Sequence, residues 1–192
     1  MRIFLLARHG ESLFNVDGIV NADPARDRGL TDRGRTQAEL LREQLASIPI
    51  DLLVTSRFPR AQETGAIALT GRDVPHVVLE DLDDVRVGEL EGKTIADYRA
   101  WKQGRPRSER FPGGESLDEA AARYADAYRA LLARPERVIL TVCHEIPVRY
   151  AVNAAARAPQ LDGPAHDIAN ATPYLFGEEQ LQIAAAVIAS LA

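Results

Sequence analysis

The sequence predicts an α/β fold built on a mostly parallel central sheet with helices on both faces. Short apolar runs alternate with longer segments whose apolar residues recur at helical spacing, and this alternation is typical of parallel sheets. The first run, residues 3–7, is apolar throughout, which indicates a strand buried on both faces. Because ligands bind at the carboxyl edge of such sheets, we expect the functional site there.

Strands are predicted where apolar or β-branched runs are bounded by turn residues. The stronger signals span residues 3–7, 52–54, 74–79 and 138–143, and the weaker ones span 167–176 and 181–191. Helices are predicted from capping residues and apolar spacing, and Ser116 with Glu119 has the form of a capping box. The predicted helices run from a Thr31 cap to Pro49, from a Ser56 cap to Gly71, over residues 95–101, from Ser116 to near Pro135, and over 147–156.

Residues 81–114 interrupt this alternation, since they contain many glycines and no sustained apolar period. Connections of this length are usually functional, and we expect an excursion over the active-site end of the sheet. No linker or repeat is found, so a single domain is expected over residues 1–192. The basic residues within 93–110 either face solvent or form a rim that steers anionic substrates. Trp101 and Phe111 either wall the site or pack in the core.

Composition excludes several classes of protein. The net charge of −5 argues against general nucleic-acid binding, and no apolar run is long enough to span a membrane. The single cysteine, Cys143, fits a reducing compartment and is expected to be a small core residue. We therefore expect a cytoplasmic protein that binds neither nucleic acid nor membrane. The oligomeric state is left open.

Two histidines and two arginines are expected to meet at the carboxyl edge. His9 and His144 each follow a predicted strand directly, Arg8 precedes the first, and Arg60 lies in the first turn of a predicted helix. Such a cluster of cations is unfavourable unless an anion occupies it. A phosphate group fits best, because guanidinium groups bind its oxygens in pairs and a neutral imidazole can attack phosphorus. A zinc site is not expected, because neighbouring arginines repel a cation.

The leaving group of such a reaction needs a proton, so we expect a carboxylic acid above the pocket. Topology alone leaves five acids of the excursion as candidates: Asp81, Asp83, Asp84, Glu89 and Glu91.

Short blocks in order along the chain resemble the histidine phosphatase superfamily, which includes the cofactor-dependent phosphoglycerate mutases. They include Arg-His-Gly-Glu-Ser at 8–12, Ser-Arg-Phe-Pro-Arg-Ala at 56–61, Gly-Glu-Leu-Glu-Gly at 88–92, Pro-Gly-Gly-Glu-Ser at 112–116 and Val-Cys-His at 142–144. A single Arg-His-Gly triplet would carry little weight, but this ordered set is specific.

The resemblance implies a role for each matching residue. His9 would be the phosphorylated nucleophile, and Arg8, Arg60 and His144 would bind the phosphoryl group. The family's usual glutamate donor falls at Asp84, which is one methylene shorter and would need a raised pKa. The substrate contacts implied or expected beside them are Asn15, Ser12, Glu145 and Ile146.

The family commonly has a glycine pair after the second histidine, where this chain has Glu145, Ile146 and Pro147. Pro147 has no amide hydrogen, so only the amides of Glu145 and Ile146 could contact phosphate. A carboxylate aimed inward would oppose anion binding, so we expect Glu145 to point away, toward an arginine.

The sequence thus predicts a phosphatase that acts on a small phosphate ester without metal or cofactor. A phosphoglycerate mutase and a non-catalytic member that binds a phosphorylated ligand are the alternatives.

Overall fold

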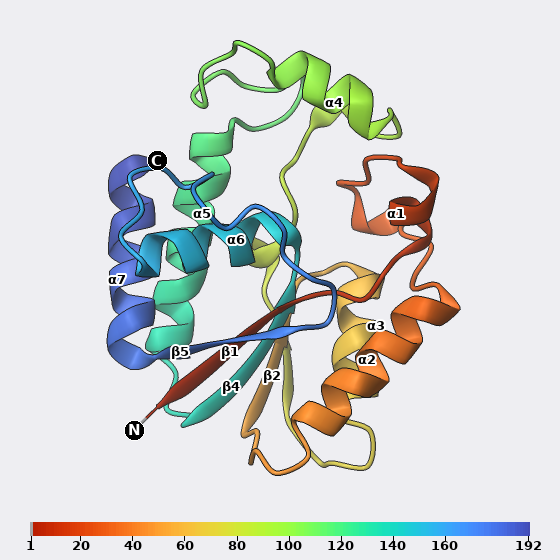
Figure 1. Cartoon of the computed structure of the whole chain (residues 1–192), viewed down its shortest axis with the longest axis vertical. Helices are drawn as coiled ribbons and strands as arrows, with labels where there is room; N and C mark the ends of the chain where they lie inside the picture. Colours follow the sequence, from red (N-terminus) through yellow and green to blue (C-terminus); the bar gives the residue numbers. More distant parts are fainter. Residues whose placement is uncertain (1) are drawn as a thin grey trace.

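The computed structural model describes residues 2–192 and contains one five-stranded sheet (Figure 1). Its strands are β1 (Ile3–Arg8), β2 (Leu52–Thr55), β3 (His76–Val78), β4 (Val138–Cys143) and β5 (Pro173–Gly177). They lie in the order β3-β2-β4-β1-β5, and only the edge strand β5 is antiparallel to its neighbour. The predicted α/β class with a mostly parallel sheet is confirmed.

Helices cover both faces of the sheet (Figure 1). They are α1 (Leu13–Asp17), α2 (Asp32–Gln44), α3 (Pro59–Ala68), α4 (Ile95–Lys102), α5 (Leu117–Leu132), α6 (Glu145–Ala155) and α7 (Glu178–Leu191). Central strand β1 divides the core: Phe4 and Leu6 pack with α5, α6 and α7, whereas Leu5 and Ala7 pack with α2 and α3. All four side chains are buried, as the apolar run predicted.

The weaker strand signals were wrong or partly wrong. Residues 181–191 belong to helix α7, whose buried residues Leu181, Ala184, Ala185 and Ile188 follow helical spacing. A nearly continuous apolar segment hides that period, so it also fits a buried strand. Within 167–176 the strand begins only at Pro173, and the third strand is limited to His76–Val78.

Two helix starts also differ from the prediction. Helix α3 has Phe58 at its N-cap with no side-chain cap, so Ser56 does not cap it, and it ends at Ala68 rather than at Gly71. Helix α6 begins at Glu145, two residues earlier than predicted. The capping box at Ser116 and the cap at Thr31 are confirmed.

The excursion over residues 81–114 lies above the carboxyl edge of the sheet, with α4 at its outer side (Figure 1). Its two arms touch at Gly88 and Gly114, where an added Cβ would lie 2.1 Å from the carbonyl oxygens of Pro112 and Arg86, respectively. Gly88 also has a φ of +55°, which L-residues with side chains rarely adopt. These glycines therefore allow the arms to pack closely enough to hold α4 over the sheet.

Aromatic rings anchor α4 to the excursion. The ring centroid of Phe111 lies 4.3 Å from that of Trp101 and 5.5 Å from that of Tyr98. Of these three only Tyr98 also lines the cavity described below, so Trp101 and Phe111 pack the excursion rather than wall the site. No helix within residues 2–192 is long and apolar enough to cross a membrane.

Candidate active site

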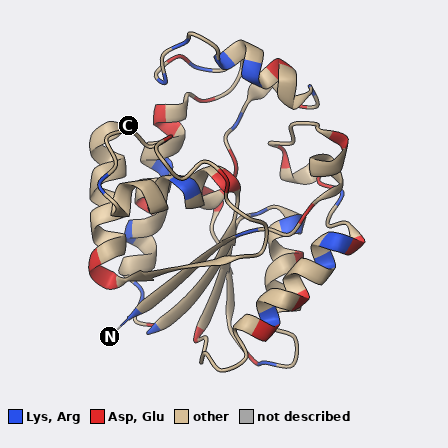
Figure 2. Cartoon of the chain, in the orientation of Figure 1, with Lys and Arg blue, Asp and Glu red and all other residues tan. Residues whose placement is uncertain are grey.

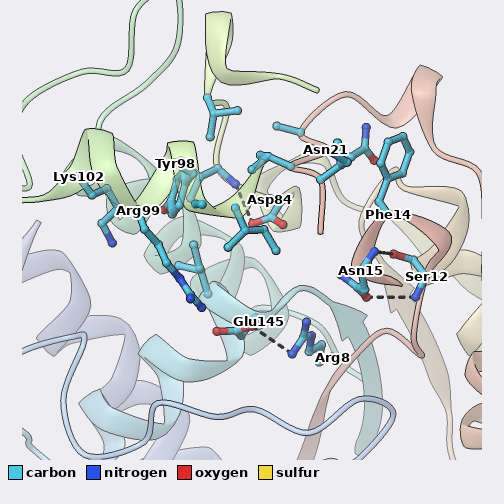
Figure 3. Close-up of a pocket in the computed structure, with 18 of the residues that line it drawn as sticks. Arg8, Ser12, Phe14, Asn15, Asn21, Asp84, Tyr98, Arg99, Lys102 and Glu145 are labelled. Carbon is cyan, nitrogen blue, oxygen red and sulfur yellow. Dashed lines mark hydrogen bonds and ion pairs between the residues drawn. The ribbon is translucent and has the colours of Figure 1, made fainter. Parts of the chain in front are cut away.

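A cavity of about 1040 Å³ lies at the carboxyl edge of the sheet, beneath α4 (Figure 3). The ends of β1 and the starts of α3 and α6 supply its base, and the excursion supplies the opposite wall. The predicted site residues that line it are Arg8, His9, Ser12, Asn15, Arg60, Asp84, Glu145 and Ile146. His144 is fully buried at the base, with its ring centroid 5.4 Å from that of His9. The structure therefore brings the predicted residues of four chain segments together.

His9 is held in one orientation at the end of β1. Its Nδ1 lies 2.7 Å from the carbonyl oxygen of Gly10 and donates to it, which leaves a lone pair on Nε2. Nε2 accepts a hydrogen bond from Nε of Arg60 at 3.0 Å. Burial, followed by the charges of Arg60 and Arg8, holds the pKa of His9 well below its usual value. The imidazole is therefore neutral at physiological pH, which nucleophilic attack requires.

His144 occupies the N-cap of α6 and faces His9 across the base of the cavity. Its Nδ1 lies 3.3 Å from Nη2 of Arg60, and its Nε2 lies 2.9 Å from Oγ of Ser56. Since the guanidinium can only donate, Nδ1 accepts and Nε2 donates to Ser56. Burial and the charge of Arg60 hold the pKa of His144 well below its usual value.

Arg60 is a buried hub between the two histidines. Its Nη1 donates to Oδ1 of Asn21 at 2.6 Å and lies 3.4 Å from the buried carboxylate of Asp27. Asn21 is itself fixed by Glu91, which accepts from its Nδ2 at 3.0 Å. One of the five candidate acids, Glu91, therefore has a supporting role.

Asp84 is the one candidate acid that lines the cavity. Its Oδ2 lies 3.6 Å from Nδ1 of His144 and 3.8 Å from Nη2 of Arg60. Burial raises the pKa of Asp84, although the charge of Arg60 opposes the shift. The neighbouring Asp83 instead binds Arg57, with Nη2 of that arginine 2.6 Å from Oδ2. Asp84 is thus the candidate acid placed to hold a proton in the cavity, beside His144 and Arg60.

Arg8 and Glu145 form an ion pair beside the histidines, with Nη1 of Arg8 3.1 Å from Oε2 of Glu145 (Figure 3). The other oxygen of Glu145 lies 3.3 Å from Nη1 of Arg149. Glu145 was expected to point away from the site toward an arginine. It does meet arginines, but its carboxylate lines the cavity, because the partly buried guanidinium of Arg8 needs a counter-charge there.

Ser12 and Asn15 form the capping box of α1. The Asn15 amide hydrogen is donated to Oγ of Ser12 at 3.2 Å, and Oδ1 of Asn15 accepts from the Ser12 amide at 3.1 Å. The Nδ2 group of Asn15 has no hydrogen bond within residues 2–192, so it remains a donor for a ligand. The hydroxyl of Ser12 is already used by the cap, and its contact with substrate stays a prediction.

The basic residues within 93–110 separate into two groups. Helix α4 carries basic residues (Figure 2), of which Arg99 and Lys102 line the cavity (Figure 3). The others that form ion pairs meet acids outside it: Arg105 with Glu109, Arg107 with Asp118 and Asp162, and Arg110 with Glu119. Only part of the predicted basic rim therefore lines the cavity.

Within residues 2–192, no group of three or more His, Cys, Asp or Glu side chains is placed to hold a metal ion. Cys143 is fully buried in β4, and burial raises the pKa of its thiol to about 12. As expected, it is a core residue rather than a nucleophile.

Comparison with known proteins identifies the family. The family profile described as "histidine phosphatase superfamily (branch 1)" matches residues 4–185. This chain belongs to the histidine phosphatase superfamily. The family membership that the sequence motifs predicted is therefore confirmed, and the matched region begins within β1 and ends within α7.

Curated relatives of this superfamily member include phosphatases and a mutase. It is 35% identical over 138 residues to 2,3-bisphosphoglycerate-dependent phosphoglycerate mutase 2 of Gloeobacter violaceus, which covers 64% of this chain and 60% of the relative. It is 34% identical to the adenosylcobalamin/alpha-ribazole phosphatase of Salmonella typhimurium over 109 residues, and this match covers 53% of this chain and 52% of the relative. The matches thus span between half and two thirds of these relatives.

The fold of the superfamily member also matches solved structures. The alpha-ribazole phosphatase from Shigella flexneri superimposes with a TM-score of 0.78 at 25% identity, over 90% of this chain and 89% of that one. The α/β architecture is thus that of known phosphatases.

Proposed function

We propose that this member of the histidine phosphatase superfamily hydrolyses a phosphate monoester of a small metabolite through a phosphohistidine intermediate. The observation that carries the proposal is that His9, Asp84, Arg8 and Arg60 line one cavity, where burial lowers the pKa of His9 and raises the pKa of Asp84. This arrangement offers a nucleophile, an acid and positive charge around one position for a phosphoryl group.

In the first step, the phosphoryl group binds between Arg8 and Arg60 above the buried His144, and Arg60 exchanges its hydrogen bond with His9 for one with a phosphate oxygen. Nε2 of His9 attacks phosphorus as the bond to the ester oxygen breaks. Asp84 donates its proton to that departing oxygen. The guanidinium groups stabilise the charge on the equatorial oxygens, so the proposed reaction needs no metal or cofactor.

In the second step, water attacks the phosphorus of phosphohistidine opposite the nitrogen. Asp84, now ionised, accepts a proton from that water, and inorganic phosphate leaves as His9 regains its neutral form. The same carboxyl group therefore acts first as acid and then as base. Hydrolysis of the intermediate distinguishes a phosphatase from a mutase, which returns the phosphoryl group to a bound product.

A phosphoglycerate mutase is the second candidate, because one curated relative at 35% identity is such an enzyme. Incubation with 3-phosphoglycerate, with both free phosphate and 2-phosphoglycerate followed, separates the two reactions. Free phosphate alone is the expected result for the hydrolase. Isomerisation without release of phosphate would favour the mutase.

The nucleophile is tested with a His9→Ala variant assayed on p-nitrophenyl phosphate. We expect at least a 1000-fold loss of kcat, about the effect of removing a catalytic nucleophile. His166→Ala is the matched control, since His166 is exposed and does not line the cavity. Rapid alkaline quenching of the wild-type reaction should trap phosphohistidine. A His9→Ala variant that turns over at the wild-type rate would exclude the proposed mechanism.

A further inference from the structure

The guanidinium of Arg8 is fixed on one side only. Its Nη1 donates to the carbonyl oxygen of Ile168 at 3.0 Å and pairs with Glu145 at 3.1 Å. Its Nε is buried without a hydrogen-bond partner, and its Nη2 has none within residues 2–192. A buried N–H without an acceptor is unfavourable, and Arg8 lines the cavity, so this unpaired edge is suited to bind an anionic ligand there.

Glu145 is itself held by further charges, although its side chain is 36% exposed. Its Oε1 pairs with Arg149, whose Nη2 donates to Oδ1 of Asp162 at 2.8 Å. The other oxygen of Asp162 accepts from Nη1 of Arg107, in the excursion, at 2.6 Å. Alternating charges therefore connect the excursion to Arg8 through Glu145.

We propose that Glu145 is a positioning residue, which holds Nη1 of Arg8 so that the Nε and Nη2 edge of the guanidinium faces the phosphoryl group. The inference rests on the proposed phosphatase function and deepens it. A long arginine side chain has many rotamers, and its two-pronged contact with phosphate depends on the angle of the guanidinium plane. A small misplacement of such a group costs reaction rate more than it costs substrate affinity.

Two other roles for Glu145 compete with this one. The carboxylate could simply oppose the anion, since like charges repel at this distance. It could also stabilise α6, because it is the first residue of that helix, where an acidic side chain interacts favourably with the helix dipole. The three roles predict different kinetics.

Separately from these roles, the negative charge of Glu145 adds to the effect of burial in raising the pKa of Asp84, which favours the protonated donor.

The variants Glu145→Ala and Glu145→Gln separate these roles. Glutamine keeps an oxygen that can accept from Nη1 of Arg8 but removes the charge. With p-nitrophenyl phosphate, we expect Glu145→Ala to lower kcat at least tenfold with a KM within threefold of wild type. We expect Glu145→Gln to restore kcat to within threefold. Glu178→Ala is the matched control, since Glu178 is also the first residue of a helix and pairs with Arg2 far from the cavity; its kcat should be unchanged.

Two results would overturn the proposal. A lower KM with unchanged kcat in Glu145→Ala would mean that the carboxylate only competes with the anion. Equal loss of kcat in the glutamine and alanine variants would mean that charge, rather than a hydrogen bond to Arg8, is what matters.

A second measurement needs no turnover and remains usable if the alanine variant folds poorly. The Nε–H resonance of Arg8 in ¹⁵N-labelled protein, assigned with Arg8→Lys, reports the environment of that edge. Addition of inorganic phosphate should shift it in the wild type and in Glu145→Gln. No shift in the wild type would overturn the assignment of this edge. If phosphate shifts the Arg8 resonance but the wild-type protein hydrolyses no phosphate ester, the positioning role of Glu145 stands and the proposed phosphatase function is rejected.

Discussion

Nε of Arg60 donates to Nε2 of His9 at 3.0 Å, so the guanidinium covers the nitrogen that attacks phosphorus in the proposed reaction. A phosphoryl group can reach this nitrogen only when Arg60 transfers its hydrogen bond to a phosphate oxygen. The same contact fixes the orientation of the His9 ring. Arg60 therefore both orients the nucleophile and receives the substrate.

Replacement of Arg60 by lysine should separate charge from geometry. An ammonium group keeps a positive charge near the buried Asp27 but cannot contact His9, Asn21 and a phosphate oxygen from one plane. We expect kcat/KM for p-nitrophenyl phosphate to fall about 100-fold, in the range measured for loss of one preorganised donor. Steady-state kinetics and thermal unfolding test this.

Arg60→Met is the companion variant for stability. It leaves the carboxylate of Asp27 buried without its cation, which costs about 3–5 kcal/mol of the free energy of unfolding. The methionine variant should therefore melt at a lower temperature than the lysine variant. If the kcat/KM of Arg60→Lys for p-nitrophenyl phosphate were within threefold of the wild-type value, the proposed role of the Arg60 guanidinium in binding phosphate would be contradicted.

The pH dependence of kcat/KM should be set by Asp84 rather than by the histidines. Burial and neighbouring arginines hold the pKa of His9 below its usual value, so the nucleophile stays neutral well into the acidic range. Burial raises the pKa of Asp84, and the donor is lost as the pH rises through that raised value. We expect an acidic optimum for alkyl phosphates, with an alkaline decline that Asp84→Asn removes. A profile that falls on the acidic side near the usual pKa of histidine would contradict this assignment.

The leaving group provides an independent test of the donor. Asp84→Asn should slow hydrolysis of alkyl phosphates more than that of aryl phosphates, because phenolate oxygens leave without protonation. We expect the ratio of the two losses in kcat to be at least tenfold, measured with glycerol phosphate and p-nitrophenyl phosphate. Asp83→Asn is the matched control, since Asp83 binds Arg57 outside the cavity. Equal losses on both substrates would place the donor elsewhere.

Much of the fold could be predicted from the sequence, because its strands and most helices have strong local signals. β1 and β4 are apolar throughout, and the Ser116 capping box is local. Helix α7 could not be distinguished from a strand, since its composition is apolar on nearly every face and its helical period is hidden. Local apolar content alone does not determine which period the chain adopts.

The site residues that directly follow a strand could be predicted from the sequence. His9 and His144 leave neighbouring parallel strands, so topology alone brings them together. Asn21 was not predicted, because no element or motif precedes it and its contact with Arg60 forms only through tertiary packing. Ser56 was assigned to a local cap, whereas its hydroxyl binds His144, far along the chain. Topology left five acids open as the donor; the family resemblance pointed to Asp84, and the path of the excursion places only that candidate in the cavity lining.

The buried histidines should also make the fold less stable in acid. Because the pKa values of His9 and His144 are lowered in the folded state, the unfolded chain binds protons first as the pH falls below the usual value of 6.5. Their contribution to stability is thus present above that pH and is lost as the pH falls toward the folded values, by up to about 1.4 kcal/mol per pH unit for each histidine. The raised pKa of Asp84 acts in the opposite direction, since its contribution is greatest below its usual value of 3.8 and is lost as the pH rises through the folded value.

Urea unfolding at pH 7, 6 and 5 measures the slope of the free energy of unfolding against pH. We expect the free energy of unfolding to decrease from pH 6.5 downward, and His144→Gln should remove about half of the histidine contribution to the slope, because one proton fewer is taken up on unfolding. His166→Gln should leave the slope unchanged, since His166 is exposed. If His144→Gln showed the same dependence of the free energy of unfolding on pH as the wild type, the His144 imidazole would take up protons as readily in the folded protein as in the unfolded chain.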